Sequence, residues 1–412
     1  MRILWHMPAL HEYGDGLSQR AYALAAELTS RGHAISFCAP ADRVFVSGST
    51  VKGFPMGRLP TSTETRPVHW SLQALSRIRA ARRLVAGLSR SHDLFISCQA
   101  EVVSAYKAIR SDAPVIFVSG SSTLLFDGAD RADQCSESVL RRLCYAIDRT
   151  LKHRNEAAAC RHADRVIFDS KHTRELVEQT YRLPGENLQT IAGGVDPTEF
   201  APPTAEQRIT ARKRLGIPED AVVVMGTGRL VERKGFAVLV SALKQLRRPF
   251  AGLIVGDGPE RGALQSLADE NTDVTIDFAG MTADVRSYLH AADIYAFTSI
   301  CESFGAALVE AMACGLPCIG VRPDGQRIVN ANLEIIDDGK SGVHCQYDVG
   351  SLAAAISKLA ADPDLRRRLG DAARKRVCEH FTWTRAGIAL CALVDSIQSP
   401  VAVPSAGLAF QG

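Results

Sequence analysis

Short apolar runs alternate with helical patterns along almost the whole chain, and this alternation limits the possible fold more than any other feature. The first series has strand-like runs at residues 3–7, 35–39, 94–97, 115–118 and 165–169, with helical patterns at 18–31 and 173–180. The alternation starts again at 221–228 and continues through 236–246, 252–256, 262–270 and 274–278. Repeated strand–helix–strand units are typical of parallel sheets covered by helices. The sequence therefore predicts an α/β protein with two Rossmann-like, doubly wound domains that face each other across a cleft.

A polar, proline-rich segment separates the two series. Residues 196–204 contain three prolines and no apolar periodicity, so we place the linker there. We expect a first domain over 1–198, a second domain over 205–376, and a helix over 377–398 that crosses back to the first domain. The tail at 399–412 is expected to be disordered. A chain of 412 residues is long enough for two such cores.

The composition argues against nucleic acid as a partner and against a membrane-spanning class. The net charge is only +3, and no run of about 18 apolar residues could form a transmembrane helix. The 11 cysteines are scattered without a Cys-x-x-Cys pair, and several lie in apolar runs, as reduced core cysteines do. These features predict a cytoplasmic protein without an integral membrane segment.

One basic segment leaves a peripheral membrane contact open. Residues 71–90 combine apolar residues at helical spacing with arginines at positions 77, 79, 82, 83 and 90. Such a helix could lie on the inner face of a membrane, or it could pack within a domain with its arginines in solvent.

The most distinctive local motif contains two glutamates, Glu302 and Glu310, on either side of a Phe-Gly pair. The pattern predicts a buried strand over 293–298, a turn over 299–305 and a helix over 306–314. Glu302 would then lie in the turn and Glu310 in the helix.

The start of that helix is a candidate anion site. The first amides of a helix have no carbonyl partner within it and point along its axis, so they can bind a phosphate. The small residues Gly305, Ala306 and Ala307 would let a phosphate approach the backbone.

Two cations, Arg229 and Lys234, follow the strand at 221–228. Together with helix-end amides they could hold a diphosphate and stabilise the charge that develops when it leaves a sugar, without a metal ion. The glycines here do not fit a dinucleotide fingerprint, and no phosphate-binding loop of the Gly-Lys-Ser/Thr type occurs, so hydride transfer and ATP hydrolysis are disfavoured. Each cation alone, or Glu310 alone, could equally be an ordinary surface residue.

With these motifs in view, the chain resembles the family 4 retaining glycosyltransferases of the GT-B fold. The motifs that carry the resemblance in the second domain are Gly228-Arg-Leu-x-x-x-Lys-Gly235, Val255-Gly-Asp-Gly-Pro259, Phe278-Ala-Gly280, Ala292-Asp293 and Glu302-Ser-Phe-Gly-x-x-x-x-Glu-Ala-Met-Ala-x-Gly-x-Pro317. Those in the first domain are looser: Gly14-x-Gly16, Arg31-Gly-His33, Ala163-Asp-Arg-Val166, and Gly194-Val-Asp196 with Phe200.

The resemblance implies catalytic roles for Glu302, Arg229 and Lys234, in which the cations bind the donor diphosphate and Glu302 contacts the sugar. It implies donor contacts from Gly16, Gly280, Met281, Phe304, Gly305, Ala306, Ala307 and Glu310. Among these, Glu310 would bind the ribose, and the base would lie near Gly280. The resemblance implies front-face attack by the acceptor hydroxyl with no settled enzyme nucleophile, no metal and no required cofactor. The co-substrate would be a nucleoside diphosphate sugar, with a UDP-sugar favoured and a GDP-sugar possible.

The chain departs from the family pattern in three places. Asp15 stands where many relatives carry a second glycine, and it would bring a negative charge toward the phosphates unless it faces the acceptor. Ser119 and Gly120 stand where many relatives have a histidine, so Ser119 or Ser121 takes over its contact with the sugar, or the sugar preference differs. The segment 320–342 is longer than in relatives and either shapes an acceptor pocket or enlarges a surface loop.

The leading hypothesis is a retaining transferase that moves a hexosyl unit onto a hydroxyl acceptor in glycan, lipid-linked saccharide or natural-product glycoside synthesis. A sugar-nucleotide epimerase or a glycoside phosphorylase or synthase of the same fold is the alternative among enzymes. A non-catalytic binding subunit is the alternative of another class, although Arg229, Lys234 and both glutamates are all retained. The sequence predicts neither the acceptor nor the oligomeric state.

Overall fold

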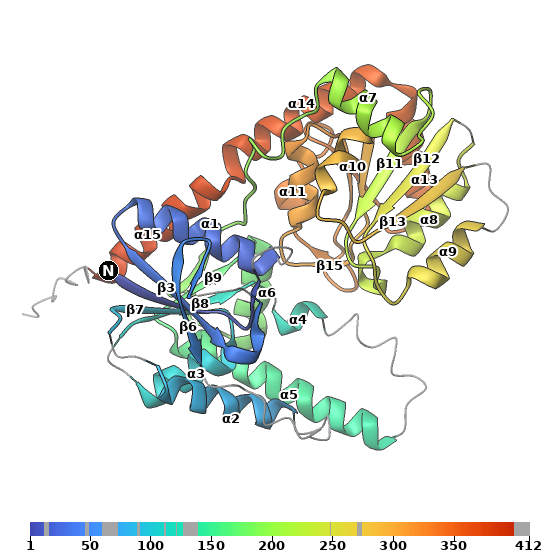
Figure 1. Ribbon diagram of the computed structural model, residues 1–412. Coiled ribbons are helices and arrows are strands. Elements are labelled where there is room, and N and C mark those ends of the chain that lie inside the picture. The colour runs from blue at the N-terminus through green and yellow to red at the C-terminus, as the bar shows by residue number, and fades with distance from the viewer. Residues whose placement is uncertain are drawn as a thin grey trace, which may run out of the picture.

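Two mainly parallel sheets, each with helices on both faces, form two neighbouring domains (Figure 1). The computed structural model describes residues 1–11, 16–45, 49–59, 73–88, 91–110, 113–120, 122–126, 139–247, 249–269 and 274–398. The predicted α/β architecture of two Rossmann-like domains is confirmed. The tail at 399–412 lies outside the described residues.

The first domain is built on an eight-stranded sheet. In spatial order its strands are β10 (Leu188–Thr190), β9 (Arg165–Phe168), β8 (Val115–Ser119), β7 (Leu94–Ser97), β1 (Arg2–His6), β3 (Ala34–Pro40), β6 (Phe54–Leu59) and β5 (Thr50–Val51). All neighbours pair in parallel except β5 and β6. Its helices are α1 (Gly16–Ser30), α2 (Gln73–Ala86), α3 (Ala100–Ile109), α4 (Thr123–Phe126), α5 (Val139–His162) and α6 (Lys171–Tyr181). A small parallel pair, β2 (Leu10–His11) and β4 (Val44–Phe45), lies beside this sheet.

The second domain repeats this plan with six strands. Their order is β13 (Thr275–Gly280), β12 (Phe250–Val255), β11 (Val222–Thr227), β14 (Ile294–Phe297), β16 (Cys318–Val321) and β18 (Val343–Cys345). Its helices are α7 (Ala205–Arg214), α8 (Phe236–Lys244), α9 (Arg261–Asp269), α10 (Val285–Ala291), α11 (Ala306–Ala313), α12 (Asn332–Ile335), α13 (Val349–Ala361) and α14 (Pro363–His380). A further short pair joins β15 (Cys301–Glu302) to β17 (Val329–Asn330).

The central strands are continuous apolar runs because both of their faces are covered. Every residue of β7, β8, β14 and β16 is buried. Strands of parallel sheets with helices on both sides have this character, whereas half-exposed strands alternate apolar and polar residues. Each sheet accordingly has two hydrophobic clusters, one on each face.

The C-terminal segment differs from the expected single helix over 377–398. Helix α14 ends at His380, and a second helix, α15 (Trp383–Gln398), begins after two residues. The break occurs where Val195 in the interdomain linker forms a parallel bridge with Thr382 and donates its N–H to the Phe381 carbonyl at 3.0 Å. Helix α15 then packs against α1 of the first domain (Figure 1).

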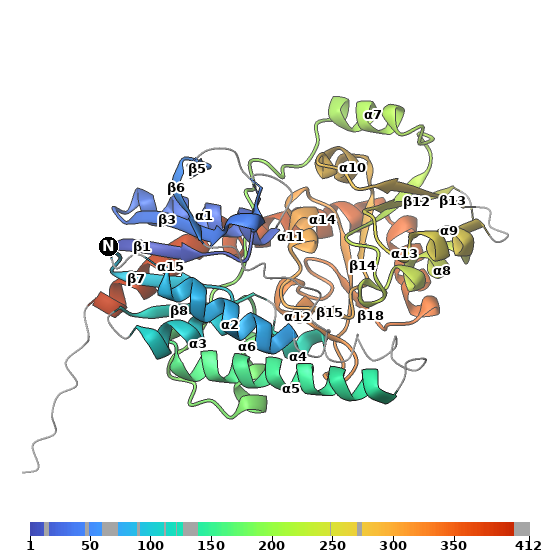
Figure 2. The same cartoon turned by 60° about the horizontal axis from the view of Figure 1, so that its bottom comes forward.

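Helix α2 is the basic segment whose surroundings the sequence left open. It packs against α3 and α5 (Figure 2), and Leu84, Val85 and Leu88 are buried there. Its apolar face is therefore covered by the domain itself, while Arg79 and Arg82 are exposed. Within the described ranges, no helix has the length and apolar character needed to span a bilayer.

Candidate functional site

Loops that follow strands of both domains meet at the candidate site. Ser303, just after β15, donates its hydroxyl to the carbonyl of Gly120 at the end of β8, at 2.8 Å. Thr173 in α6 donates its hydroxyl to the Ser303 carbonyl at 3.5 Å. In open α/β sheets ligands bind at the carboxyl ends of strands, so this junction is the expected place for a substrate.

Lys234 and Glu302 form an ion pair at this junction, with both side chains mostly buried. The Ser299 hydroxyl also donates to the Glu302 carboxylate, at 3.2 Å. The Lys234 ammonium lies 6.0 Å from the centre of the Phe297 ring, within the range of a cation–π interaction. A phosphate that binds Lys234 must therefore compete with Glu302 for the ammonium group.

Gly235 fixes the path of the chain after Lys234. Its φ is +68°, a value that favours glycine, and an added Cβ would lie 2.3 Å from the Thr298 carbonyl oxygen. This close approach brings the end of β11 against the end of β14, which places Lys234 beside Glu302.

The start of α11 has the form that the sequence predicted. Gly305 precedes the helix with a φ of +102° and no side chain caps the first turn. Ala306 is exposed and Ala307 is half-buried, so their amides lie near the surface. Such uncapped amides attract an anion.

Glu310 lies in the second turn of α11, and its side chain is half-buried. Burial, with a smaller contribution from the charge of Glu199, raises the pKa of Glu310 to about 7. Among the described residues no side chain or amide donates a hydrogen bond to this carboxylate. Its acceptor capacity is thus available for hydroxyl groups of a ligand.

The remaining predicted donor residues of the second domain lie at or just after the carboxyl ends of β11 and β13. Arg229 is exposed just after β11. Gly280 ends β13 with a φ of +74°, and its carbonyl accepts from the Gly256 amide at 2.9 Å. The next residue, Met281, is 85% exposed.

A cavity of only about 10 Å³ lies beside Lys234 and is lined by Thr227, Lys234, Phe236, Ala296, Phe297, Thr298 and Ser299. That volume holds at most about one water molecule, and all seven lining residues belong to the second domain.

Phe304 differs from the expectation of a donor contact. Its ring is buried, packs 5.9 Å from the ring of Phe381, and lies where a Cβ on Gly193 would be only 2.7 Å away. The side chain therefore fills the junction with the linker, and its backbone leads into the start of α11.

The hydroxyl of Ser119, which the sequence suggested as a contact for the donor sugar, has a partner within the first domain. It is buried, and its hydroxyl donates to the Glu156 carboxylate at 3.5 Å within the first domain. The neighbouring residue, Gly120, contributes the carbonyl that Ser303 contacts. Gly16 is the first residue of α1, whereas Asp15 and Ser121 lie outside the described residues.

The site contains a buried ion pair that the sequence did not reveal. Arg20 of α1 pairs with Asp169, which follows β9, and a Cβ on Gly120 would lie 3.5 Å from the Asp169 carboxylate. Burial raises the pKa of Asp169, the Arg20 guanidinium opposes this rise, and the charge of Glu302 adds to it. The two carboxylates are thus near enough to interact across the domain junction. Only the position of Asp169 directly after a strand could have suggested a role.

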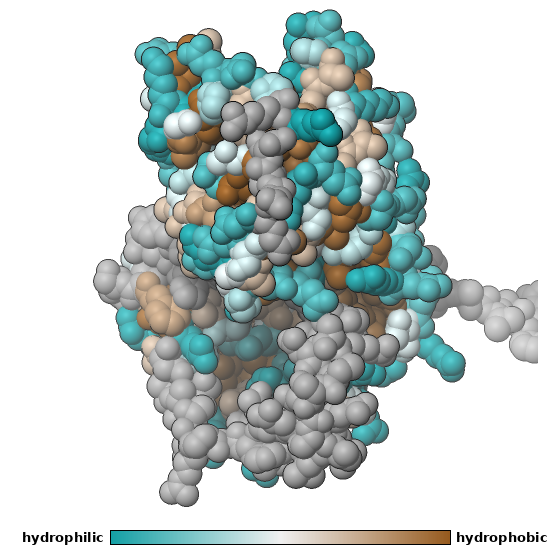
Figure 3. All heavy atoms as spheres, turned by 90° about the vertical axis from the view of Figure 1, so that its right-hand side faces the viewer, coloured by the Kyte–Doolittle hydropathy of each residue, from teal (hydrophilic) through white to brown (hydrophobic). Residues whose placement is uncertain are grey.

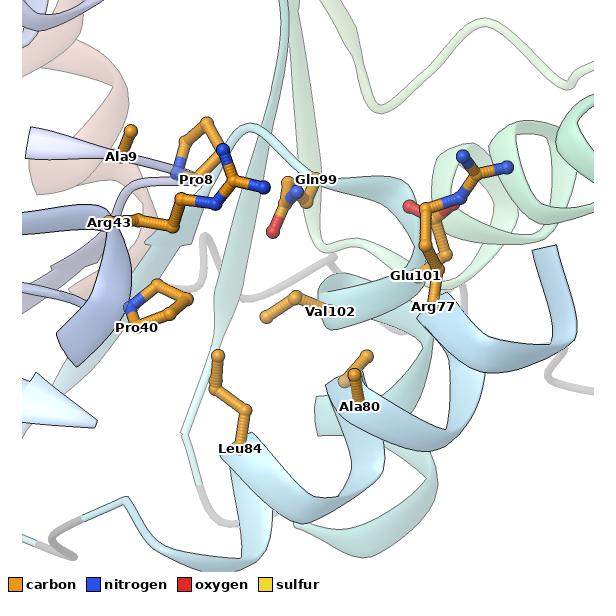
Figure 4. A pocket seen from close by; sticks show the side chains of 11 residues that line it. Pro8, Ala9, Pro40, Arg43, Arg77, Ala80, Leu84, Gln99, Glu101 and Val102 are labelled. Atoms are coloured by element: carbon orange, nitrogen blue, oxygen red, sulfur yellow. The ribbon is translucent and has the colours of Figure 1, made fainter. Parts of the chain in front are cut away.

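A larger pocket of about 370 Å³ opens at the carboxyl ends of β1 and β3 (Figure 4). Pro40, Leu84 and Val102 contribute carbon side chains, and Arg43 reaches toward Gln99. The full lining is Pro8, Ala9, Pro40, Arg43, Arg77, Ala80, Ala81, Leu84, Gln99, Glu101 and Val102. Two strand spacings, roughly 10 Å, separate the end of β8 from the end of β1, so the pocket lies farther along the same edge as Gly120.

Comparison with known proteins gives matches in both domains. The family model described as "Glycosyltransferase Family 4" matches residues 14–199, and the one described as "Glycosyl transferases group 1" matches residues 207–376. The chain is 40% identical over 160 residues to the lipopolysaccharide core biosynthesis glycosyltransferase LpsD of Rhizobium meliloti (strain 1021), covering 39% of this chain and 45% of that protein. It is 34% identical over 250 residues to the GDP-mannose-dependent alpha-(1-6)-phosphatidylinositol monomannoside mannosyltransferase of Mycolicibacterium smegmatis, covering 57% of this chain and 62% of that protein. The matched part spans about half the length of these curated relatives.

A solved structure has the same fold over nearly the full length. Sucrose-phosphate synthase from Thermosynechococcus elongatus superposes with a TM-score of 0.74 at 21% identity, and the match covers 96% of this chain and 99% of that one. One family model falls on each domain, and the two together cover most of the chain. The chain therefore belongs to the family 4 glycosyltransferases, which have the GT-B fold.

Proposed function

We propose that the protein transfers a sugar from a nucleoside diphosphate sugar to a hydroxyl acceptor, with retention of configuration at the anomeric carbon. The observation that carries the proposal is the grouping of Lys234, Glu302 and the uncapped start of α11 at the domain junction. The half-buried Glu310 lies one turn farther along the helix. This set matches the separate parts of such a donor: anionic phosphates, a sugar and a ribose.

In the proposed reaction Lys234 leaves Glu302 and binds the diphosphate together with Arg229 and the amides of Ala306 and Ala307. Glu302 is then available to the hydroxyl groups of the sugar. The bond between the anomeric carbon and the phosphate oxygen breaks while the acceptor oxygen bonds to the same face of that carbon. The proton of the acceptor hydroxyl goes to the departing phosphate oxygen. Fixed cations and amides stabilise the charge that grows on the leaving group.

The nucleoside of the donor is a finer part of the proposal. Uridine is our first candidate and guanosine the second, since one relative is by its name GDP-mannose-dependent. We assign the base to the surface beside Gly280 and Met281, because Met281 offers an exposed apolar side chain there.

The acceptor, in this proposal, extends into the 370 Å³ pocket of the first domain. The pocket lies beyond Gly120 along the sheet edge, so an acceptor with more than one unit could place its hydroxyl at the junction and its remainder in the pocket. Filling the pocket by Ala80→Phe should raise KM for the acceptor and leave nucleotide affinity unchanged. An unchanged KM would remove the pocket from the proposal.

The experiment that tests the donor site is thermal stabilisation by UDP, GDP, ADP, dTDP and NAD, measured on the wild type and on Glu310→Ala. A ligand at 100 times its Kd stabilises the folded state by about 2.7 kcal/mol. We expect a selective shift with one nucleoside diphosphate and its loss in the variant. A shift with NAD alone, or with no nucleotide, would overturn the proposed donor site.

A further inference from the structure

The first turn of α6 is capped from two domains. Ser170 accepts from the Thr173 amide at 3.1 Å, which is an ordinary cap within the first domain. The two preceding amides, of Lys171 and His172, donate instead to the carboxylate of Glu334 in the second domain, at 2.9 and 2.6 Å. The first amides of a helix have no carbonyl partner within it. A carboxylate at this position therefore accepts two hydrogen bonds and interacts favourably with the positive end of the helix dipole.

The segment around Glu334 is held firmly in the second domain. Arg376 of α14 donates to the carbonyls of Ile335 and Glu334, at 2.7 and 2.8 Å. The Asn332 side chain donates to the Val321 carbonyl at 2.8 Å, and both Asn332 and Ile335 are fully buried. Glu334 is therefore presented to α6 by a fixed support in the second domain.

This support is continuous with the strand that carries Glu302. The Val329 amide donates to the Ile300 carbonyl at 2.7 Å, and β17 pairs with β15 so that Asn330 lies opposite Glu302. The Asn330 side chain also donates to the Ser299 carbonyl at 3.0 Å. A short hydrogen-bonded unit thus joins the Glu334 carboxylate to the Glu302 strand.

We propose that Glu334 is a positioning residue that holds the cleft closed during the reaction by capping α6 across the domains. The proposal rests on the proposed transferase function. In the proposed function the donor binds the second domain and the acceptor binds the first, so both substrates enter through the junction where Ser303 meets Gly120, and the domains must separate to admit them. When they close, the carboxylate returns to the Lys171 and His172 amides and sets the distance between Glu302 and the Asp169–Gly120 side of the site.

Hydrogen exchange tests the contact directly and does not depend on turnover. In the wild type the amides of Lys171 and His172 should exchange slowly, because both donate to Glu334. In Glu334→Ala they should exchange about ten-fold faster or more, as uncapped first-turn amides do. The Thr173 amide, capped by Ser170, is the internal control. Equal exchange of Lys171 and His172 in the two proteins would overturn the proposal.

A matched pair of variants tests the same contact from the first domain. Lys171→Pro removes the N–H at a position where proline is favoured, and the extended backbone of Ser170 (φ −146°, ψ 155°) suits a residue before proline. Lys171→Ala removes the side chain and keeps the N–H. We expect Lys171→Pro and Glu334→Gln to lower kcat about ten-fold each and their combination to add little more, while Lys171→Ala stays near wild type.

Turnover is followed as release of nucleoside diphosphate from UDP-glucose and GDP-mannose, and nucleotide affinity by titration with UDP and GDP. Affinity should change less than two-fold in Glu334→Gln, because the expected nucleotide contacts, apart from the backbone of Gly16, come from the second domain. A wild-type kcat in Glu334→Gln, or an equal loss in Lys171→Ala and Lys171→Pro, would refute the positioning role. If the wild type turns over neither donor, the proposed function is at fault, and the exchange experiment alone decides the contact.

Discussion

Glu310 shows how burial prepares a single carboxylate for a ligand. Removal from water disfavours the charged form and raises its pKa to about 7. Two hydroxyl groups of a ribose would donate to the charged form and lower the pKa again. Because the pKa in the folded protein lies above the ordinary 4.5, ionised Glu310 disfavours the folded state above pH 7, and this cost disappears below about pH 4.5.

This linkage predicts that nucleotide-sugar binding releases protons near neutral pH. Affinity should rise about ten-fold from pH 6 to pH 8, because the carboxylate must be ionised to accept both hydrogen bonds. Titration calorimetry at pH 7 in buffers of different ionisation enthalpy should show about half a proton released per nucleotide sugar bound. A nucleotide sugar is preferred as the ligand because its diphosphate does not titrate in this range.

Glu310→Gln is the control for this linkage. The variant cannot titrate, so its remaining affinity should be independent of pH between 6 and 8. The same proton release from the variant and the wild type would assign the linkage to another group.

Ser119 and Phe304 show what residue type alone cannot predict. Both stand at positions where the sequence suggested a ligand contact, yet the hydroxyl of Ser119 donates to Glu156 and the ring of Phe304 packs toward the linker. The direction of a side chain depends on partners that are distant in sequence. For the same reason the Arg20–Asp169 pair, which joins residues 149 positions apart, could not be predicted from either local pattern.

At the scale of elements, α7 is joined to the second sheet by a charged cluster around Asp293. The Asp293 carboxylate, at the start of β14, accepts from Arg208 at 2.5 Å, from Arg212, and from the Val223 amide at 2.8 Å. Arg212 is 8% exposed, so its charge depends on this partner. The cluster ties the helix after the linker to the two central strands of the sheet.

Removing the carboxylate should therefore destabilise the fold strongly. We expect Asp293→Ala to lower the free energy of unfolding by about 3–5 kcal/mol, because it leaves a buried guanidinium without its counter-ion. Urea denaturation of the isolated chain measures the change. Arg367→Ala, which removes a surface ion pair with Asp364 of 2.9 Å, is the control and should cost less than about 1 kcal/mol. Equal midpoints for the two variants would contradict this account of the cluster.

Elements with a strong local pattern were predictable from the sequence, and those made by long-range pairing were not. The apolar runs of β7 and β8 and the small residues that begin α11 match the predicted elements closely. Strand β15 has only two residues and exists because β17 pairs with it, so the sequence showed only a turn there. The break between α14 and α15 likewise depends on the linker.

At the scale of the whole molecule, two chain segments run between the domains side by side. One passes through Val195 and the other through Thr382, and the bridge between them keeps the crossings together. A hinge of this kind and the Glu334 contact on α6 would together limit how far the domains can separate. The sequence located the linker near this place but could not show that the second crossing pairs with it, since the pairing joins residues almost 190 positions apart.

Gly194 is the residue on which the close approach of the two crossings depends. An added Cβ would lie 2.5 Å from the Thr382 carbonyl carbon and 2.5 Å from the Trp383 nitrogen, and backbone atoms cannot give way as a flexible side chain can. Gly194→Ala should therefore push the crossings apart, increase the radius of gyration measured by X-ray scattering, and lower the melting temperature. Gly262→Ala is the matched control, since that glycine lies in α9 with no atom within 4 Å of an added Cβ, and alanine favours a helix. If Gly194→Ala keeps the radius and melting temperature of the wild type, the paired crossings are not the hinge that sets the domain arrangement.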